Sequence, residues 1–251
     1  MSMNRRAPLE GKTALVTGAS RGLGAGIARE LAQQGARVAI TYRASRESAE
    51  ALVADIRHDG GEAIALRADS SDPASVQQGV RDVVGAFGRL DILVNNAGGG
   101  WFEPFAETPD DHIEQTINLN IRGTVYATQE ALKHLPDGGR IITIGSINAV
   151  SIPFTGGAIY GMSKAALVAF TQGLARELGP RRITVNIVHP GPIDTDGNPE
   201  DGPSASMLAG LTALGYFGTA ADVGSLVAWI ASPGASYMTG SAVVIDGGWT
   251  A

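Results

Sequence analysis

The 251-residue chain contains no cysteine, which excludes disulfide bonds and thiolate ligands for zinc or iron–sulfur clusters. This absence fits a reducing compartment, so we expect a cytoplasmic protein. Histidine is also scarce, and the four residues do not have the close spacing that is typical of metal ligands. They are His58, His112, His134 and His189. We therefore expect no bound metal.

Long apolar runs and an excess of positive charge are missing as well. No stretch approaches the roughly 18 uninterrupted apolar residues that a membrane-spanning helix needs. Residues 1–10 include Arg5 and Arg6 but no apolar run behind them, so we expect a short flexible arm and no secretion signal. The chain has 19 Lys and Arg against 25 Asp and Glu, a net charge of −6, which disfavours nucleic acid as a partner. These features predict a soluble protein.

Glycine, in contrast, is abundant, with 34 residues that cluster where apolar runs end. Seven short apolar runs rich in β-branched residues predict strands, and helical stretches separate them. The predicted strands are residues 13–17, 38–42, 63–66, 92–94, 141–144, 183–188 and 242–245. The predicted helices are residues 24–34, 45–58, 73–86, 109–135, 160–178 and 220–231.

This alternation predicts an α/β fold. Because the strands are apolar throughout, both faces of the sheet should be covered, as in a doubly wound (Rossmann) parallel sheet of about seven strands. A (β/α)8 barrel needs one more unit and is less favoured. No linker divides the chain, so we expect a single domain over residues 1–251. Residues 191–216 break the alternation and contain Met207 and Leu208, which predicts a mobile lid there.

A glycine-rich turn, Thr17-Gly18-Ala19-Ser20-Arg21-Gly22-Leu23-Gly24, follows the first predicted strand. Glycines let backbone N–H groups approach a pyrophosphate, and the N-terminus of the next helix attracts its charge. The spacing is G-x-x-x-G-x-G, which differs from the common G-x-G-x-x-G fingerprint. Taken alone, the turn could also serve only close packing of strand and helix.

The turn resembles the cofactor loop of short-chain dehydrogenases/reductases. The resemblance continues through Asn95-Asn96-Ala97-Gly98, Tyr160-x-x-x-Lys164, Pro190-Gly191 and Asp246-Gly247-Gly248, over nearly the whole chain. It implies cofactor contacts at Gly18, Ser20, Arg21, Gly22, Leu23, Gly24, Tyr42, Arg43, Ala68, Asp69, Ser70, Asn96, Ala97, Gly98, Tyr160, Lys164, Pro190, Gly191, Ile193 and Thr195.

The end of the second predicted strand indicates which dinucleotide binds. Tyr42 stands where relatives that prefer NAD usually carry an acidic residue, and Arg43 follows it. An arginine there, with Arg21, can hold the 2′-phosphate of NADP, so NADP is favoured over NAD. The alternatives are that Arg43 and Arg46 are solvated loop charges, and that Asp69 only caps a turn.

Tyr160 and Lys164 are four residues apart, so they share one face of a helix. A free tyrosine has a pKa of about 10, and a nearby ammonium lowers it toward the range of a general acid. The resemblance implies that Lys164 does this while holding the nicotinamide ribose, that Ser146 binds the substrate oxygen, and that Asn120 holds a water. Asn118 is the competing choice for the last role.

These residues predict an NADPH-dependent reductase that converts a ketone into a secondary alcohol. The pocket should be apolar, with contributions from Trp101, Phe102, Phe105, Ile147, Ile152, Phe154 and Met207. The chain resembles both 3-oxoacyl-(acyl carrier protein) reductases and general carbonyl reductases. Arg176, Arg181 and Arg182 are available for an acidic carrier protein. The chain is nevertheless less basic than we expect for such a contact, so the general reductase ranks first.

Two other functions stay open: an NAD-dependent alcohol or polyol dehydrogenase, and a non-catalytic nucleotide sensor. The resemblance also implies a homotetramer formed through the helix that carries Tyr160 and the last strand, with Trp249 near the contact.

Overall fold

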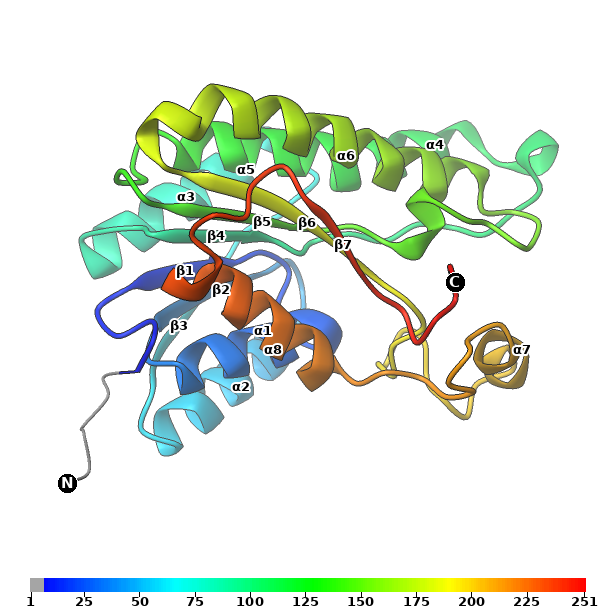
Figure 1. Ribbon diagram of the computed structural model, residues 1–251, viewed down its shortest axis with the longest axis horizontal. Coiled ribbons are helices and arrows are strands. Elements are labelled where there is room, and N and C mark those ends of the chain that lie inside the picture. Colours follow the sequence, from blue (N-terminus) through cyan, green and yellow to red (C-terminus); the bar gives the residue numbers. More distant parts are fainter. Residues whose placement is uncertain (1–6) are drawn as a thin grey trace.

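The computed structural model describes residues 7–251, and its seven strands form one parallel sheet (Figure 1). The strand order is β3-β2-β1-β4-β5-β6-β7. The strands are β1 (Thr13–Val16), β2 (Arg37–Tyr42), β3 (Glu62–Arg67), β4 (Ile92–Asn95), β5 (Arg140–Ile144), β6 (Thr184–Pro190) and β7 (Ala242–Ile245). This order is that of a doubly wound sheet, so the predicted fold class is confirmed.

Helices cover both faces of the sheet, and each face has its own apolar core (Figure 1). One face carries α1 (Gly22–Gln33), α2 (Arg46–His58) and α8 (Ala220–Ala231), whose buried residues include Ile27, Leu52 and Val227. The other face carries α3 (Pro73–Phe87), α5 (Gly123–Ala131) and α6 (Ala158–Leu178). Strands that are buried on both faces explain the continuous apolar runs of the sequence.

The position of the site follows from the strand order. β1 and β4 are neighbours, with Leu15 opposite Leu93, although the chain passes through β2 and β3 between them. The connections after β1 and β4 therefore leave on opposite sides, which opens a crevice at the carboxyl ends of these strands. The glycine turn follows β1, and Asn96 follows β4, so the two segments meet at this crevice.

The expected helix over residues 109–135 is interrupted. The structure has α4 (Asp110–Ile117), a π-helical turn η2 (Asn118–Arg122) and then α5. Asn120 lies in this turn, and its side chain bonds to Gly99 and Ser163 instead of facing solvent. Insertions of this kind recur at functional sites, because they redirect one side chain without ending the helix.

The predicted flexible arm is wrong for residues 7–10. Leu9 is only 1% exposed, and its backbone N–H donates to the carbonyl of Gln34 at 2.9 Å. An apolar residue held in the core in this way anchors the chain just before β1. The first six residues of the expected arm lie outside the part that the structure describes.

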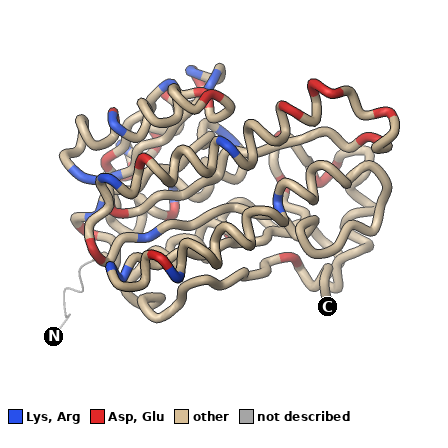
Figure 2. The backbone as a smooth tube through the Cα atoms, turned by 90° about the horizontal axis from the view of Figure 1, so that it is seen from above, with Lys and Arg blue, Asp and Glu red and all other residues tan. Residues whose placement is uncertain are grey.

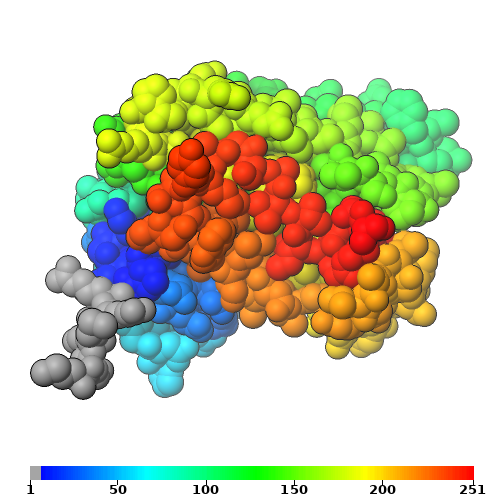
Figure 3. Space-filling model, viewed as in Figure 1, coloured from blue at the N-terminus to red at the C-terminus, as the bar shows by residue number. Residues whose placement is uncertain are grey.

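The predicted lid contains a short helix, α7 (Ala205–Gly210), on which Met207 is exposed as expected. After α7 the chain runs beside the C-terminus, since the N–H of Leu214 donates to the carbonyl of Gly247 at 3.0 Å. Figure 3 shows this segment, in yellow to orange, next to the red C-terminal residues. Within residues 7–251 no helix is long and apolar enough to cross a membrane.

Candidate active site

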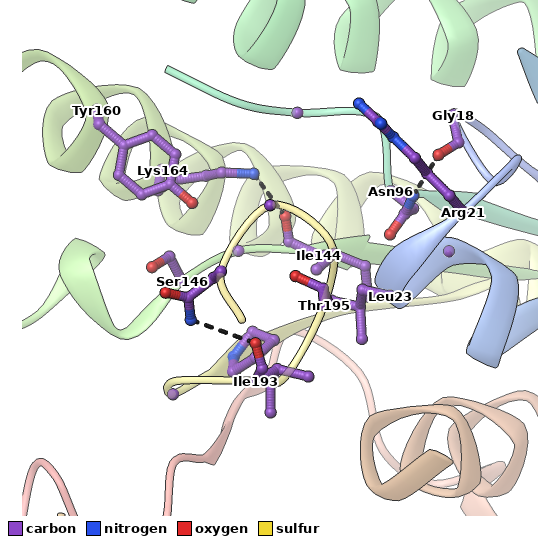
Figure 4. A pocket seen from close by; sticks show the side chains of 17 residues that line it. Gly18, Arg21, Leu23, Asn96, Ile144, Ser146, Tyr160, Lys164, Ile193 and Thr195 are labelled. Atoms are coloured by element: carbon purple, nitrogen blue, oxygen red, sulfur yellow. Dashed lines mark hydrogen bonds between the residues drawn. The ribbon is translucent and has the colours of Figure 1, made fainter. Parts of the chain in front are cut away.

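A cleft of about 400 Å³ opens at the carboxyl ends of the strands (Figure 4). Thirteen of the predicted site residues line it: Gly18, Arg21, Leu23, Gly24, Asn96, Gly98, Ser146, Tyr160, Lys164, Pro190, Gly191, Ile193 and Thr195. The other predicted residues do not line it: Ser20, Gly22, Tyr42, Arg43, Ala68, Asp69, Ser70, Ala97 and Asn120. The cleft therefore unites the glycine turn with Ser146, Tyr160 and Lys164, whereas the residues expected at the ends of β2 and β3 lie outside it.

Glycines shape the turn between β1 and α1. Gly18 and Gly22 have φ angles of +61° and +55°, which side chains other than glycine rarely adopt. A Cβ atom on Gly24 would lie 2.5 Å from the amide nitrogen of Asn96. The turn thus needs glycine for backbone conformation at two positions and for close packing at a third.

Asn96 joins the two sides of the crevice. Its side-chain amide donates to the carbonyl of Thr17 at 2.9 Å and to that of Gly18 at 3.1 Å. In return, the hydroxyl of Thr17 accepts the backbone N–H groups of Asn96 and Ala97, each at 3.0 Å. Ala97 therefore braces the glycine turn without lining the cleft.

The N-terminus of α1 faces the cleft without a competing anion. No side chain caps the helix, and its first turn contains no acidic residue. Arg21, at the N-cap position, is exposed and lines the cleft. Free N–H groups, the helix dipole and a guanidinium together form a favourable environment for a phosphate group.

The tips of β2 and β3 lie next to each other, away from the cleft lining. The carbonyl of Tyr42 accepts the N–H of Ala68 at 2.9 Å, and Arg43 is exposed beside them. Asp69 accepts from the N–H and the hydroxyl of Ser71 at 2.9 and 2.7 Å. Burial works to raise the pKa of Asp69, but the bonds from Ser71 and the charge of Arg43 together hold this pKa below its usual value. Asp69 therefore caps a turn in the structure, as the alternative interpretation predicts.

Tyr160 and Lys164 both point into the cleft from α6, as their spacing predicts (Figure 4). Lys164 is 4% exposed, and its amine donates to the carbonyl oxygen of Ile144 at 3.0 Å. Burial lowers the pKa of Lys164 to about 8, so the amine is still mostly protonated at pH 7.

The expected lowering of the Tyr160 pKa is absent in this structure. Burial raises the pKa of Tyr160, and a hydrogen bond with the side chain of Ser146 acts in the opposite direction without reversing it. The Lys164 nitrogen lies 5.8 Å from the centre of the tyrosine ring and bonds to a backbone carbonyl. The pKa rises because desolvation penalises the phenolate more strongly than the hydrogen bond with Ser146 favours it.

Ser146 is fixed by its neighbours at the end of β5. Its Oγ accepts the N–H of Asn148 at 3.1 Å, at the start of the short turn η3 (Ile147–Ala149). Its backbone N–H and carbonyl both contact Nδ1 of His189, at 3.1 and 2.8 Å. His189 is fully buried, and burial lowers its pKa, which keeps the ring neutral at pH 7.

Asn120 does not line the cleft but stabilises the backbone next to it. Its side chain exchanges two hydrogen bonds of 2.9 Å with the backbone of Gly99 and donates to the hydroxyl of Ser163 at 2.8 Å. A Cβ atom on Gly98 would lie 2.8 Å from the Lys164 nitrogen and 3.1 Å from Oδ1 of Asn120. Only glycine fits between these two groups. Asn118, the alternative, instead accepts from the exposed Arg122.

The loop after β6 closes the cleft over the glycine turn. A Cβ atom on Gly22 would lie 3.5 Å from that of Thr195, and Ile193 is buried nearby. Sequence reasoning missed four lining residues: Ile144, Gly145, Gly197 and Asn198. The first two directly precede Ser146 at the end of a strand, a position that already indicates a site. Gly197 and Asn198 follow Thr195 in a loop with no distinguishing motif.

Aromatic side chains form a wall next to Tyr160. The Phe102 ring lies 5.2 Å from that of Tyr160 and 5.8 Å from that of Phe154, between ring centres. Trp101 stacks on His112 at 4.1 Å, and His112 contacts Glu103 at 2.9 Å. Ile147 is buried, whereas Phe105 and Met207 are exposed without a ring contact to this wall.

The arginines considered for a carrier protein are not at the mouth of the cleft. Arg176 lies in the last turn of α6, and Arg181 and Arg182 lie between α6 and β6, at the amino end of the strand, opposite the cleft. Arg181 is engaged there with Asp137 and with the carbonyls of Leu132 and Leu135. Among the described residues, no group of three potential ligands is placed to hold a metal ion.

Comparisons with known proteins agree with this geometry. A family model described as enoyl-(acyl carrier protein) reductase matches residues 18–250. A short-chain dehydrogenase/reductase from Serratia marcescens is 50% identical, with a TM-score of 0.96 over 97% of this chain and 100% of that one. A short-chain dehydrogenase from Burkholderia cenocepacia, solved in complex with NADP, has the same identity, TM-score and coverage. The chain belongs to the short-chain dehydrogenase/reductase family and is an NAD(P)-dependent oxidoreductase.

One relative carries a name of a different kind. The cyclic-di-GMP-binding biofilm dispersal mediator protein of Escherichia coli K12 is 44% identical over 96% of this chain and 98% of its own length. This name describes binding of cyclic-di-GMP and does not mention a reaction.

Proposed function

We propose that the protein reduces a ketone to a secondary alcohol with NADPH. The observation that carries this proposal is the convergence of Ser146, Tyr160 and Lys164 on one cleft that also contains the glycine turn. A protein that only binds a nucleotide would need the glycine turn, but it would not need a phenol and an amine side by side on one helix face.

The residues present fit a dinucleotide. The open N-terminus of α1, with Arg21 beside it, suits the pyrophosphate. Pro190, Gly191, Ile193 and Thr195 line the part of the cleft where the resemblance implies the nicotinamide. Arg43 follows β2 with no acidic residue at its tip, which favours a 2′-phosphate over a free ribose hydroxyl. The Burkholderia protein that is solved with NADP supports the same choice.

Each catalytic side chain has a distinct task in this proposal. When bound, the nicotinamide would supply a hydride to the carbonyl carbon of the substrate. Tyr160 donates its proton to the substrate oxygen, and the hydroxyl of Ser146 holds that oxygen while negative charge develops on it. The raised pKa of Tyr160 keeps the phenol protonated, which is the form that reduction requires.

Lys164 and Asn120 assist these two residues. The Lys164 amine holds the ribose and provides positive charge near the phenolate that forms after proton transfer. Asn120, which bonds to Gly99 next to Gly98, keeps the backbone beside Lys164 in place. In this proposal it also holds the water through which Tyr160 regains a proton.

The sensor hypothesis is the second candidate, and the name of the Escherichia coli relative favours it. Both candidates use the same cleft, but only the reductase consumes its nucleotide. An NAD-linked alcohol dehydrogenase and a carrier-protein reductase remain variants of the first candidate that differ in nucleotide and substrate.

One experiment separates these candidates. The purified protein is mixed with NADPH or NADH and a panel of ketones and 3-oxoacyl thioesters, and nucleotide oxidation is followed by absorbance. We expect faster oxidation of NADPH than of NADH with at least one ketone. Tight binding of NADPH without turnover of any compound would overturn the reductase proposal in favour of the sensor.

We also propose that the protein is a homotetramer and that residues 191–216 act as a lid. Exposed apolar side chains on α6, α8 and β7, namely Met162, Trp229 and Val244, are consistent with buried contacts in an assembly. Trp249 is half-buried in the single chain, close to the end of β7. Light scattering on the purified protein tests the assembly, and a monomer mass would overturn it.

A further inference from the structure

The substrate side of the cleft is surrounded by acidic residues and contains few basic ones. Three segments frame the substrate side: residues 98–117, 146–163 and 191–219. The first contains five acidic residues and the third four, the second contains no charged residue, and none of the three contains a lysine or an arginine. The five acidic residues of the first segment are Glu103, Glu107, Asp110, Asp111 and Glu114, and the four of the third are Asp194, Asp196, Glu200 and Asp201.

Each of the three segments contributes residues to the cleft lining, so these carboxylates lie on segments that adjoin the cleft. All except Glu103 are exposed, and Glu103 contacts His112. Asp194 and Asp196 flank Thr195, and Glu103 follows Phe102, whose ring contacts Tyr160. Figure 2 shows acidic residues gathered at the end of the molecule that carries the C-terminus, while most lysines and arginines lie toward the other end.

The two cations that line the cleft have other tasks. Arg21 stands at the start of α1, and Lys164 bonds to the carbonyl of Ile144 at the reacting centre. Neither is free to neutralise an anion at the outer rim. A charged substrate therefore meets a negative field on entering, over a range of about 8 Å at physiological salt.

The wall beside the Tyr160 ring is apolar. Phe102 and Phe154 stand next to Tyr160, and residues 146–163 add no charge. Phe102 and Phe154 do not line the cleft itself, but a substrate whose carbonyl oxygen reaches Tyr160 comes close to the Phe102 ring, 5.2 Å from the tyrosine ring. Aromatic or other apolar groups fill such a surface favourably.

From the acidic rim and the aromatic wall together, we infer that the site takes apolar, especially aromatic, ketones without negative charge, and favours those with a positive charge away from the carbonyl. Carboxylate-bearing ketones and thioesters on an acidic carrier protein are repelled. This inference rests on the proposed ketone reduction and adds the charge of the substrate to it.

Three ketones of similar shape test the inference: 4-methylacetophenone, 4-acetylbenzoate and 4-(aminomethyl)acetophenone. Their kcat/KM values with saturating NADPH are measured at low and at high salt. At low salt we expect the amine to exceed the carboxylate by about tenfold or more, and at high salt we expect the ratio to shrink severalfold, because screening weakens the rim.

A variant without rim charges provides the second measurement. Glu107→Gln/Asp111→Asn/Glu114→Gln removes three exposed carboxylates of residues 98–117, and Asp59→Asn/Glu62→Gln/Glu177→Gln removes three at the other end of the sheet. We expect the low-salt ratio to fall severalfold in the rim variant and to stay unchanged in the control.

The outcomes are distinguishable. Turnover of 4-methylacetophenone with equal kcat/KM for amine and carboxylate at low salt would overturn the inference and leave the proposed reductase intact. A preference for the carboxylate would do the same. No turnover of any of the three ketones, together with none in the wider panel, would overturn both.

Discussion

The Nζ atom of Lys164 lies 3.0 Å from the carbonyl oxygen of Ile144, to which it donates a hydrogen bond inside the cleft. This bond holds a buried amine next to the end of β5, where Ser146 also stands. Burial brings its pKa down to about 8, so the folded chain carries a costly charge at neutral pH. The site thus keeps a destabilising group that the proposed reaction needs.

Lys164→Met should therefore stabilise the protein while abolishing its activity. The pKa of Lys164 is lower in the folded state than in the unfolded state, so the unfolded chain binds more protons between pH 8 and 10.5. The contribution of this group to stability consequently rises with pH across that window. Removing the charge should raise the free energy of unfolding at pH 7 by about 1 to 3 kcal/mol.

Chemical denaturation at pH 7 and pH 10 measures this effect without any ligand. The gain from Lys164→Met should be smaller at pH 10, where the wild-type amine has lost its proton. A variant that is less stable than the wild type at pH 7 would contradict the proposed cost of the buried ammonium.

Gly98→Ala should impair activity without unfolding the protein. The added Cβ would lie 2.8 Å from the Lys164 nitrogen and 3.1 Å from Oδ1 of Asn120, so one of these groups must move. We expect kcat to fall by about 10- to 100-fold, which is typical when a catalytic group is misplaced.

Gly173→Ala is the matched control, because Gly173 lies on α6 with nothing within 4 Å of an added Cβ. It should retain full activity and gain about 0.5 to 1 kcal/mol of stability from higher helix propensity. Equal kcat for Gly98→Ala and Gly173→Ala would show that the close approach at Gly98 has no role in catalysis.

Arg43→Asp should change the preference for the nucleotide. The arginine follows β2, where a 2′-phosphate is expected, and an aspartate there would repel this phosphate and accept a bond from a ribose hydroxyl. We expect Kd for NADPH to rise by about 10- to 100-fold and Kd for NADH to change little. Fluorescence titration with both nucleotides measures this.

Arg176→Asp, the same change on an exposed residue of α6 far from the cleft, is the control and should affect neither Kd. If Arg43→Asp weakened both nucleotides equally, Arg43 would have no part in selecting NADPH.

The sequence predicts what depends on local spacing. The four-residue separation of Tyr160 and Lys164 places both on one side of α6, and the glycines of the turn after β1 correspond to real backbone requirements. The seven apolar runs likewise correspond to the seven strands.

Features that depend on tertiary environment were not predictable in the same way. The π-helical turn at Asn120 follows from bonds to Gly99 and Ser163, which are distant in sequence. The direction of the Tyr160 pKa depends on how many groups cover the ring, and no spacing rule contains that information. For the same reason Leu9, in an arm expected to be flexible, is buried against the chain near Gln34.

The central claim is that the Tyr160 hydroxyl is the proton donor in ketone reduction, and Tyr160→Phe tests it most directly. Steady-state turnover is measured together with NADPH affinity, and Tyr237→Phe, on a fully exposed ring, serves as the control. We predict that Tyr160→Phe lowers kcat by about 10²- to 10⁴-fold and leaves Kd for NADPH within about twofold. Wild-type turnover by the Tyr160→Phe variant would contradict the account.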